Sequence, residues 1–290
     1  MQISGFTFVR NAIQYDYPVV ESIRSILPIV DEFIVSVGNS EDQTLSLIQS
    51  MQSPKIKIIE SIWDDSLREG GRVLAIETDK AFSHVSEKTD WAFYLQADEV
   101  VHEKYHQTII NAARQFKDQP QVEGLLFNYL HFYGTYDYVG DTRRWYDKEI
   151  RIIRNDKSIR SYRDAQGFRK HDRKLNVKHI DASIYHYGWV KHPQLQQHKR
   201  EHFGKLWSDE EQTAADKQQQ EIFNYVNDAD SLIKFTGTHP ATMHQRIKDK
   251  NWQLDFDLTK KKLSFKDRLL YKIEKITGKR LFNYRNYRVI

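Results

Sequence analysis

The sequence predicts an α/β fold in which a mainly parallel, mixed sheet is flanked by helices. Short apolar runs alternate with segments whose apolar residues recur at helical spacing, and this alternation is typical of βαβ units. One run, 91–95, is apolar throughout, as expected for a strand buried on both faces. We predict strands over 3–9, 33–37, 56–59 and 91–95, and helices over 18–27, 45–51, 71–85 and 102–116.

The second half of the chain is less regular. It predicts strands over 124–131, 149–154 and 183–187, and a polar helix over 194–226. We therefore divide the chain into a main domain, 1–190, whose two halves meet near residue 100, and a helical extension, 191–290, with a basic tail, 259–290.

The composition is that of a globular protein, with 39% hydrophobic and 13% aromatic residues. The absence of cysteine excludes disulfides, thiolate zinc sites and cysteine nucleophiles. Residues 1–10 predict a strand and not a signal peptide, and no apolar run approaches the roughly 20 residues that span a bilayer. We therefore expect the chain to stay in the cytoplasm.

The basic residues gather in the tail 259–290, where eleven Lys and Arg face Asp267 and Glu274, so the rest of the chain is net acidic. The tail predicts an amphipathic helix with an apolar stripe and basic flanks: Phe265, Leu269, Leu270, Ile273 and Ile276 beside Lys266, Arg268, Lys272 and Lys275. Such a helix binds an anionic membrane surface, or it packs its stripe on the main domain. The acidic remainder argues against nucleic acid.

Polar segments follow the predicted strands of the first half, at the sheet edge where ligands bind in α/β folds. They are 10–11, 38–42, 63–65 and 96–99. The strand 91–95 leads directly to Asp98 and Glu99, and carboxylates on a rigid strand end suit a divalent cation that bridges a diphosphate. The alternative is that Asp98 or Glu99 caps the following helix.

The chain resembles a family 2 glycosyltransferase of the GT-A fold. The likeness lies in the segments 5–12, 31–44, 91–99, 149–155 and 185–189, and it covers about residues 1–190. It implies a GT-A-like catalytic domain with a nucleotide-binding half, about 1–100, and an acceptor half, about 100–190. The implied reaction moves a sugar, of hexosyl type, from a nucleotide-sugar donor to a carbohydrate or lipid-linked acceptor for a cell-surface polysaccharide or glycolipid. A UDP-sugar is the favoured donor, and direct inversion is the expected mechanism.

The resemblance assigns roles to particular residues. Asp98 matches the second aspartate of the family's aspartate-x-aspartate motif, and with His186 it would bind Mn²⁺ or Mg²⁺. Arg10, Asn11, Asp42, Gln96 and Asp98 would lie around the nucleotide sugar. Two departures stand out: Gln96 replaces the first aspartate of the motif, and Val37 replaces an aspartate that contacts the base in many members.

Further candidates come from the residues themselves. Arg72, after two glycines at a helix start, could bind an anion, and Arg144 could grip the diphosphate, although both could be surface arginines. An inverting transferase needs a general base, and Asp164 is the first candidate, with Asp147 and Asp172 as rivals. His186 could equally be a packed, hydrogen-bonded histidine.

Two other functions are open. Residues 102–106 fit H-E-x-x-H, in which His102 and His106 on one helical face hold zinc and Glu103 is the base of a hydrolase. The neutral Gln96 suggests the second alternative, a nucleotide-sugar-binding domain without catalysis.

Overall fold

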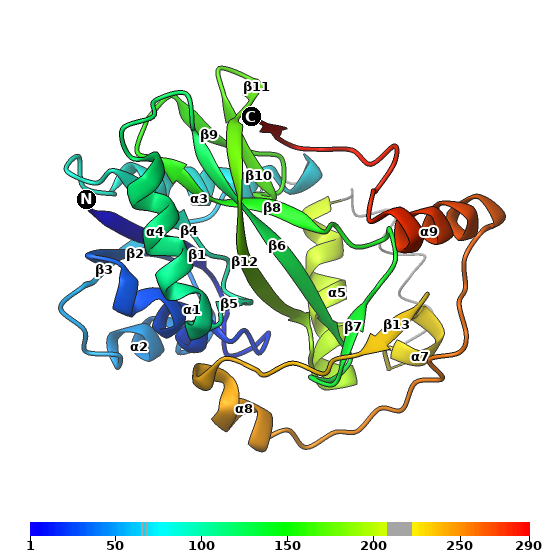
Figure 1. The fold of residues 1–290 in the computed structure, drawn as a ribbon. Coiled ribbons are helices and arrows are strands. Elements are labelled where there is room, and N and C mark those ends of the chain that lie inside the picture. The colour runs from blue at the N-terminus through cyan, green and yellow to red at the C-terminus, as the bar shows by residue number, and fades with distance from the viewer. Residues whose placement is uncertain (65, 68, 208–221) are drawn as a thin grey trace.

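The computed structural model describes residues 1–64, 66–67, 69–207 and 222–290. Its first half contains a parallel sheet in the order β3-β2-β1-β4 (Figure 1). These strands are β1 (Ile3–Val9), β2 (Glu32–Gly38), β3 (Ile56–Ser61) and β4 (Trp91–Tyr94). All four were predicted from the sequence, and their ends differ from the prediction by no more than a few residues.

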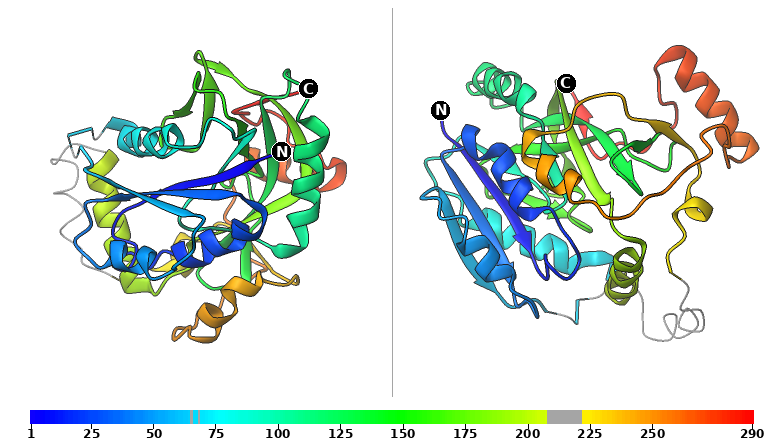
Figure 2. Two further views of the ribbon diagram at one scale, coloured as in Figure 1. Left: turned by 90° about the vertical axis from the view of Figure 1, so that its left-hand side faces the viewer. Right: turned by 90° about the horizontal axis from the view of Figure 1, so that it is seen from below.

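Helices cover both faces of this sheet (Figure 2). Apolar residues of α1, α2 and α4 pack with Phe33 and Phe93 on one face, and those of α3 pack with Phe6 and Tyr94 on the other. Because neighbouring strand residues point to opposite faces, each strand contributes to both cores, which explains the apolar run 91–95. The helical elements are α1 (Val19–Ile26), η1 (Leu27–Ile29), α2 (Thr44–Gln49), η2 (Glu69–Gly71), α3 (Arg72–Ser83), η3 (Glu103–Tyr105) and α4 (His106–Phe116).

The antiparallel strand β8 (Lys148–Arg154) joins this parallel sheet to the strands of the second half. It lies between β4 and β6 (Gly124–Tyr133), and β6 pairs in parallel with β12 (Asn176–Trp189). The remaining strands of this large sheet are short: β5 (Glu99–Val101), β7 (Tyr138–Gly140), β13 (Leu232–Lys234) and β14 (Arg288–Val289). The predicted fold class, a mainly parallel mixed sheet flanked by helices, is confirmed.

A smaller, three-stranded sheet shares no strand pairing with the large sheet. It contains β9 (Ile159–Tyr162), β10 (Gly167–Lys170) and β11 (Arg173–Lys174), in antiparallel pairs. Ile159 and Phe168 of these strands belong to the same buried cluster as α3, so this sheet and α3 cover one face of the large sheet together.

The strand expected at 183–187 is 14 residues long in the structure. The first half of β12 alternates buried Val177, Ile180 and Ala182 with exposed or half-exposed polar residues. The polar residues interrupt every apolar run there, so no continuous strand pattern appears in the sequence.

The helix predicted over 102–116 starts later than expected, at His106. His102 has extended backbone angles, φ −74° and ψ 133°, because it directly follows β5, which pairs with β12. A single 3₁₀ turn, η3, separates it from α4, so the sequence pattern was right about the helix and wrong about its start.

The helix predicted over 194–226 is interrupted. Its first part is α5 (Pro193–Trp207), residues 208–221 lie outside the described residues, and 222–224 are not helical before the short α7 (Tyr225–Asp228). Among its described residues, the extension also contains η4 (Ala241–Met243), α8 (His244–Lys248) and α9 (Phe265–Thr277). The strands β13 and β14 belong to the extension and pair with β7 and β12, and the division at residue 190 stays a prediction.

Helix α9 has a well-defined start and end. The Ser264 hydroxyl accepts a hydrogen bond from the backbone N–H of Asp267 at 3.1 Å, and Gly278 ends the helix with a φ of 66° that favours glycine. Of the helices in the described residues, none is long and apolar enough to cross a membrane.

A buried ion pair connects the first residue of β5 to β8. Arg151 donates from Nε to Glu99 Oε2 at 2.8 Å and from Nη2 to Glu99 Oε1 at 2.7 Å, and both side chains are fully buried. Tyr129 donates from its hydroxyl to the same carboxylate at 2.6 Å. The Glu99 carboxylate therefore accepts two hydrogen bonds from the Arg151 guanidinium and one from a hydroxyl. Hydrogen bonds to a charged group are strong in a buried region of low dielectric.

We expect Arg151→Met to lower the free energy of unfolding by about 3–5 kcal/mol, because it leaves the Glu99 carboxylate buried without its cation. Urea denaturation followed by circular dichroism measures the change. Arg160→Met is the matched control, since Arg160 on β9 is exposed and its loss should change stability by about 0.5 kcal/mol or less. A loss below about 1 kcal/mol for Arg151→Met would contradict the role of the pair.

Candidate functional site

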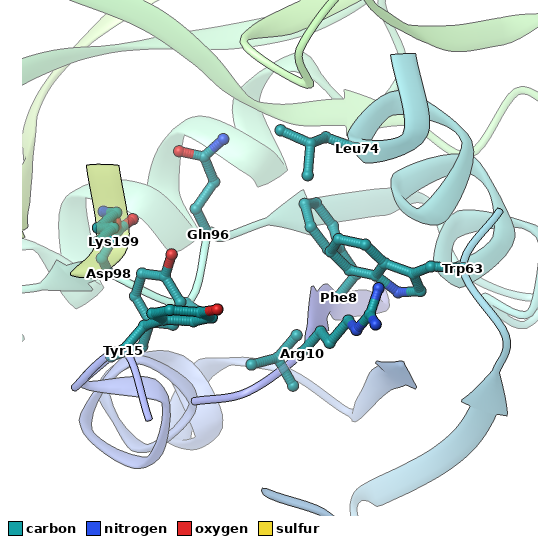
Figure 3. Close-up of a pocket in the computed structure, with 11 residues that line it drawn as sticks. Phe8, Arg10, Tyr15, Trp63, Leu74, Gln96, Asp98 and Lys199 are labelled. Atoms are coloured by element: carbon teal, nitrogen blue, oxygen red, sulfur yellow. The ribbon is translucent and has the colours of Figure 1, made fainter. Parts of the chain in front are cut away.

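A pocket of about 140 Å³ lies at the carboxyl ends of β1 and β4 (Figure 3). Four of its eleven lining residues are aromatic, and three are charged. Its lining residues are Phe8, Val9, Arg10, Tyr15, Tyr17, Trp63, Leu74, Gln96, Ala97, Asp98 and Lys199. This is the sheet edge at which the sequence predicted a ligand site.

One end of the pocket is aromatic. The rings of Phe8 and Trp63 lie 5.6 Å apart, and the Arg10 guanidinium lies 5.6 Å from the Trp63 ring (Figure 3). Gly38 makes this possible, because a Cβ at that position would lie 2.4 Å from Trp63 Nε1. A flat apolar wall beside a guanidinium suits a flat heterocycle that carries an anionic group.

The other end of the pocket brings a carboxylate, an imidazole and an ammonium together. Asp98 Oδ1 lies 3.7 Å from His186 Nε2, and Asp98 Oδ2 lies 3.4 Å from Lys199 Nζ. Gly188 must be a glycine here, because an added Cβ would lie 2.5 Å from Asp98 Oδ2 and 2.7 Å from His186 Nε2. The backbone carbonyl of Asp98 accepts from the Tyr187 N–H at 2.8 Å, which fixes the loop after β4 against β12.

A second histidine sets the protonation of His186. His131 Nε2 lies 2.9 Å from the Tyr146 carbonyl and must donate to it, so the Nδ1 of a neutral His131 accepts from His186 Nδ1 at 3.2 Å. Burial lowers the pKa of His131 well below its usual value, with a further contribution from His186, and so keeps His131 neutral. The bond keeps a proton on His186 Nδ1, so His186 Nε2 presents a lone pair to Asp98 when the ring is neutral and a proton when the ring is charged.

Burial and charge oppose each other at this end of the pocket. Burial alone would raise the pKa of Asp98, but His186, Lys199 and Lys191 lower it overall, so Asp98 is a carboxylate. Burial lowers the pKa of Lys199, and Asp98 partly offsets this effect. Burial, together with nearby Lys199, holds the pKa of Lys191 well below its usual value.

Four of the predicted residues meet at the pocket. Arg10, Gln96 and Asp98 line it, and His186 contacts Asp98. Gln96 donates from its backbone N–H to Glu99 Oε2 at 3.0 Å and from Nε2 to the Ala165 carbonyl at 3.4 Å. The neutral side chain therefore links the end of β4 to the turn before β10.

Asn11 and Asp42 do not line the pocket. The Asp42 carboxylate accepts from the backbone N–H groups of residues 13, 14 and 44 at 2.8–3.0 Å. Asn11 has a φ of 54°, and its Oδ1 accepts from the Glu41 N–H at 2.7 Å. Both side chains hold the turn that follows Arg10, a structural role that differs from the predicted contact with the nucleotide.

The two arginines proposed for anions lie away from the lining. Arg72 is exposed at the first position of α3. Arg144 donates from Nη2 to Asp228 Oδ2 at 2.8 Å and from Nη1 to the Asp228 carbonyl at 2.9 Å, above the rings of Trp145 and Trp189. Arg144 thus joins the 141–147 segment to α7.

Asp164 lies in the 163–166 turn between β9 and β10, which Gln96 contacts through the Ala165 carbonyl. Arg163 and Ala165 on either side have φ values of 56° and 62°, an unusual conformation for residues other than glycine. Burial raises the pKa of the Asp164 carboxyl. Of its rivals, Asp147 pairs with Lys148 at 3.0 Å, and Asp172 lies in the turn between β10 and β11.

The zinc interpretation of residues 102–106 is wrong about the geometry. His102 is extended and its Nε2 lies 2.9 Å from Thr238 Oγ1, whereas His106 Nε2 lies 2.7 Å from the Ser25 carbonyl. Glu103 accepts from the Ala241 N–H at 3.1 Å. The two imidazoles therefore do not share a helical face, because the helix starts only at His106.

Several pocket residues had not been identified from the sequence. They are Phe8, Tyr15, Tyr17, Trp63, Leu74 and Lys199. Trp63 stands in a predicted strand-end segment, so its position was a signal that could have found it. Lys199 comes from a polar helix one hundred residues further along the chain, and no local pattern distinguishes it from a surface lysine.

The site offers a divalent cation two protein ligands. Asp98 Oδ1 and the Nε2 lone pair of His186 are close enough to share one ion, because typical ligand bonds are about 2.0–2.2 Å long. Throughout the described part of the chain, no group of three or more His, Asp or Glu could hold a metal. The donor set therefore fits a cation whose other ligands come from a bound molecule or water.

Comparisons with known proteins give only distant likenesses. No protein-family model and no curated protein matches the chain. Among solved structures, S. aureus TarS is 14% identical over 70% of this chain and 39% of TarS, with a TM-score of 0.38. A fragment of TarS, 1–349, in complex with UDP is 13% identical over 73% of this chain and 68% of the fragment, also with a TM-score of 0.38.

A second match, glucosyl-3-phosphoglycerate synthase from Mycobacterium tuberculosis in complex with Mn²⁺, UDP and phosphoglyceric acid, is 17% identical over 45% of this chain and 43% of that one, with a TM-score of 0.30. A third, 4-diphosphocytidyl-2C-methyl-D-erythritol synthase from Anaerococcus prevotii, is 9% identical over 66% of this chain and 90% of that one, with a TM-score of 0.39. The named activities differ among these matches, and likenesses this weak assign none of them to the chain.

Proposed function

We propose that the chain is a glycosyltransferase that moves a sugar from a nucleotide-sugar donor to a carbohydrate or lipid-linked acceptor. The observation that carries the proposal is the pocket itself, with aromatic rings and Arg10 toward one end and Asp98 and Lys199 at the other. Behind the pocket lining, Asp98 contacts His186. A nucleoside diphosphate has the same two parts, a flat base and an anionic diphosphate. We take UDP-sugars as the favoured donors and hexosyl transfer as the reaction.

The two ends of the pocket divide the work of donor binding. Phe8 and Trp63 would contact the base, and Arg10 and Lys199 would offset the diphosphate charge. Asp98 and His186 would hold Mn²⁺ or Mg²⁺, and the bound ion would neutralise charge on the leaving nucleoside diphosphate. Since the protein supplies only two of its ligands, the ion would bind firmly only together with the diphosphate.

The transfer itself would be a direct displacement with inversion. An acceptor hydroxyl attacks the anomeric carbon and gives its proton to the Asp164 carboxylate, while the bond from that carbon to the diphosphate breaks. The raised pKa of Asp164 suits a general base, because a more basic carboxylate takes the proton more readily. The acceptor would belong to a cell-surface polysaccharide or glycolipid.

The exposed side of α9 supports a membrane-bound acceptor. Phe265 and Ile276 of α9 are 88% and 84% exposed, and α9 also carries several basic residues. Phe282, which follows the helix, is 92% exposed. Leu270 and Ile273 are half-buried, and Tyr271 donates to Asp141 Oδ2 at 2.5 Å, so the other side of α9 holds it to the main body. We propose that this exposed surface rests on an anionic membrane at the cytoplasmic face.

A thermal-shift screen of UDP, GDP, dTDP and CDP, with and without Mn²⁺, tests the donor site. We expect one nucleotide to stabilise the protein more strongly with Mn²⁺, by about 2.7 kcal/mol at 100 times its dissociation constant. Asp98→Ala should abolish the effect of the metal on nucleotide binding. Trp63→Ala should weaken nucleotide binding both with and without metal. Binding without any sugar transfer to a broad acceptor set would favour a non-catalytic binding domain. If none of the four shifts the melting temperature, the donor site is wrong.

Asp164→Asn should lower kcat by about 10²–10⁴-fold, because the acceptor proton loses its base. In the unchanged enzyme the base works only when ionised, so activity should be full well above the raised pKa of Asp164 and fall as the pH drops through it. A pH profile of kcat/KM measures this limb, and Asp147→Asn is the control that should retain it. A normal kcat in Asp164→Asn would show that another group is the general base.

Vesicle sedimentation tests the membrane surface. We expect the protein to bind phosphatidylcholine vesicles that contain phosphatidylglycerol, and to bind less as salt screens the charges. A Phe265→Ser, Ile276→Ser, Phe282→Ser variant should lose binding, whereas Ile62→Ser, at an 80% exposed site elsewhere, should retain it. Equal binding to neutral and anionic vesicles would contradict an electrostatic contact.

A further inference from the structure

Lys199 stands where a cation beside Asp98 is expected. Its Nζ lies 3.4 Å from Asp98 Oδ2 and donates to the Gly188 carbonyl at 3.2 Å. It also lies 4.9 Å from the centre of the Tyr17 ring, and its side chain is only 16% exposed. The ammonium therefore already neutralises the carboxylate that the divalent ion would use.

The surroundings of Lys199 contain more positive than negative charge. Lys191 is fully buried, lies 4.6 Å from the same Tyr17 ring, and donates to the Asp16 carbonyl at 2.8 Å. The Asp16 carboxylate itself is paired with Arg246, so Asp98 is the carboxylate that faces both lysines. Two lysines therefore lie beside one carboxylate, and this excess of basic side chains favours the arrival of an anion.

Asp98 and Lys199 differ in how easily their charged groups can move. Asp98 cannot move easily, because its backbone is bonded to Tyr187 and its side chain is pressed against Gly188. Lys199 can, because its charge sits on a flexible four-carbon stem.

We propose that Lys199 exchanges partners when the donor binds: its ammonium leaves Asp98 for the diphosphate, and the divalent ion takes its place beside Asp98. A dication and an ammonium that share one carboxylate would repel each other, so the exchange makes metal binding depend on the nucleotide. Lys199 is then a donor-binding residue that also keeps metal out of the empty pocket. The diphosphate half of the exchange depends on the function proposed above, whereas the competition for Asp98 does not.

Isothermal titration with Mn²⁺ alone, and with UDP in EDTA, tests both halves. Lys199→Gln keeps a hydrogen-bond donor near Asp98 and removes the charge. We expect it to tighten Mn²⁺ binding to the nucleotide-free protein by about tenfold and to weaken UDP binding in EDTA by about tenfold or more, as for loss of a charged hydrogen bond. Lys199→Arg, which keeps the positive charge, should bind UDP more tightly than Lys199→Gln. Arg200→Gln, the exposed neighbour on α5, is the control that should change neither.

Each outcome decides a part of the inference. Unchanged Mn²⁺ affinity in Lys199→Gln would overturn the competition for Asp98. If Lys199→Gln binds Mn²⁺ more tightly but binds UDP with unchanged affinity, the exchange is overturned, because Lys199 would then interact with Asp98 and not with the diphosphate. If the wild-type protein binds none of UDP, GDP, dTDP or CDP under any condition, the proposed function fails and the diphosphate half fails with it. The Mn²⁺ titration still decides the competition in that case.

Discussion

The ion pair between Glu99 and Arg151 is the interaction on which the rest of the site depends. It joins the first residue of β5 to the antiparallel strand β8, and both partners are fully buried. Glu99 also accepts from the Gln96 backbone, so the carboxylate fixes the short loop that carries Asp98. A buried charge of this kind holds its position because every alternative would leave it without a partner in a region of low dielectric.

A second constraint comes from β12, which passes the same loop on its other side. Its pairing with β5 sets His186 opposite Glu99, and Gly188 leaves room for the Asp98 carboxylate. His131 on β6 then orients His186 through a hydrogen bond between the two rings. The geometry around Asp98 is therefore set by backbone pairing and by two histidines, which is a more rigid arrangement than one held by surface loops.

The charges around the pocket follow from this arrangement. Glu99, the acidic neighbour of Asp98, is already paired with Arg151, and the neutral Gln96 stands two residues before Asp98. The site consequently has few ligands for a metal cation and several basic side chains that can bind an anion. This balance is the physical reason why a diphosphate and a metal would bind together here more readily than either would alone.

The sequence by itself determined the four parallel strands of the first half, the helices between them and the edge of the sheet where the pocket lies, but not the short β5. Periodicity is a local property, so runs such as 91–95 and the polar residues after them could be identified without knowing their neighbours. The full length of β12 was not predicted, because polar residues interrupt its apolar pattern. The late start of α4 was not predicted either, because it depends on the pairing of β5 with β12.

Only the tertiary structure decided which polar residues face each other. Asp42 and Arg144, plausible ligands in the sequence, are taken up by backbone N–H groups and by Asp228, because buried or turn-forming polar groups must find partners wherever the chain brings them. Lys199 reaches Asp98 from a helix far along the chain, and no local pattern records that meeting. Contacts of this kind depend on long-range packing, so composition and spacing can nominate the residues of a site while the fold alone selects among them.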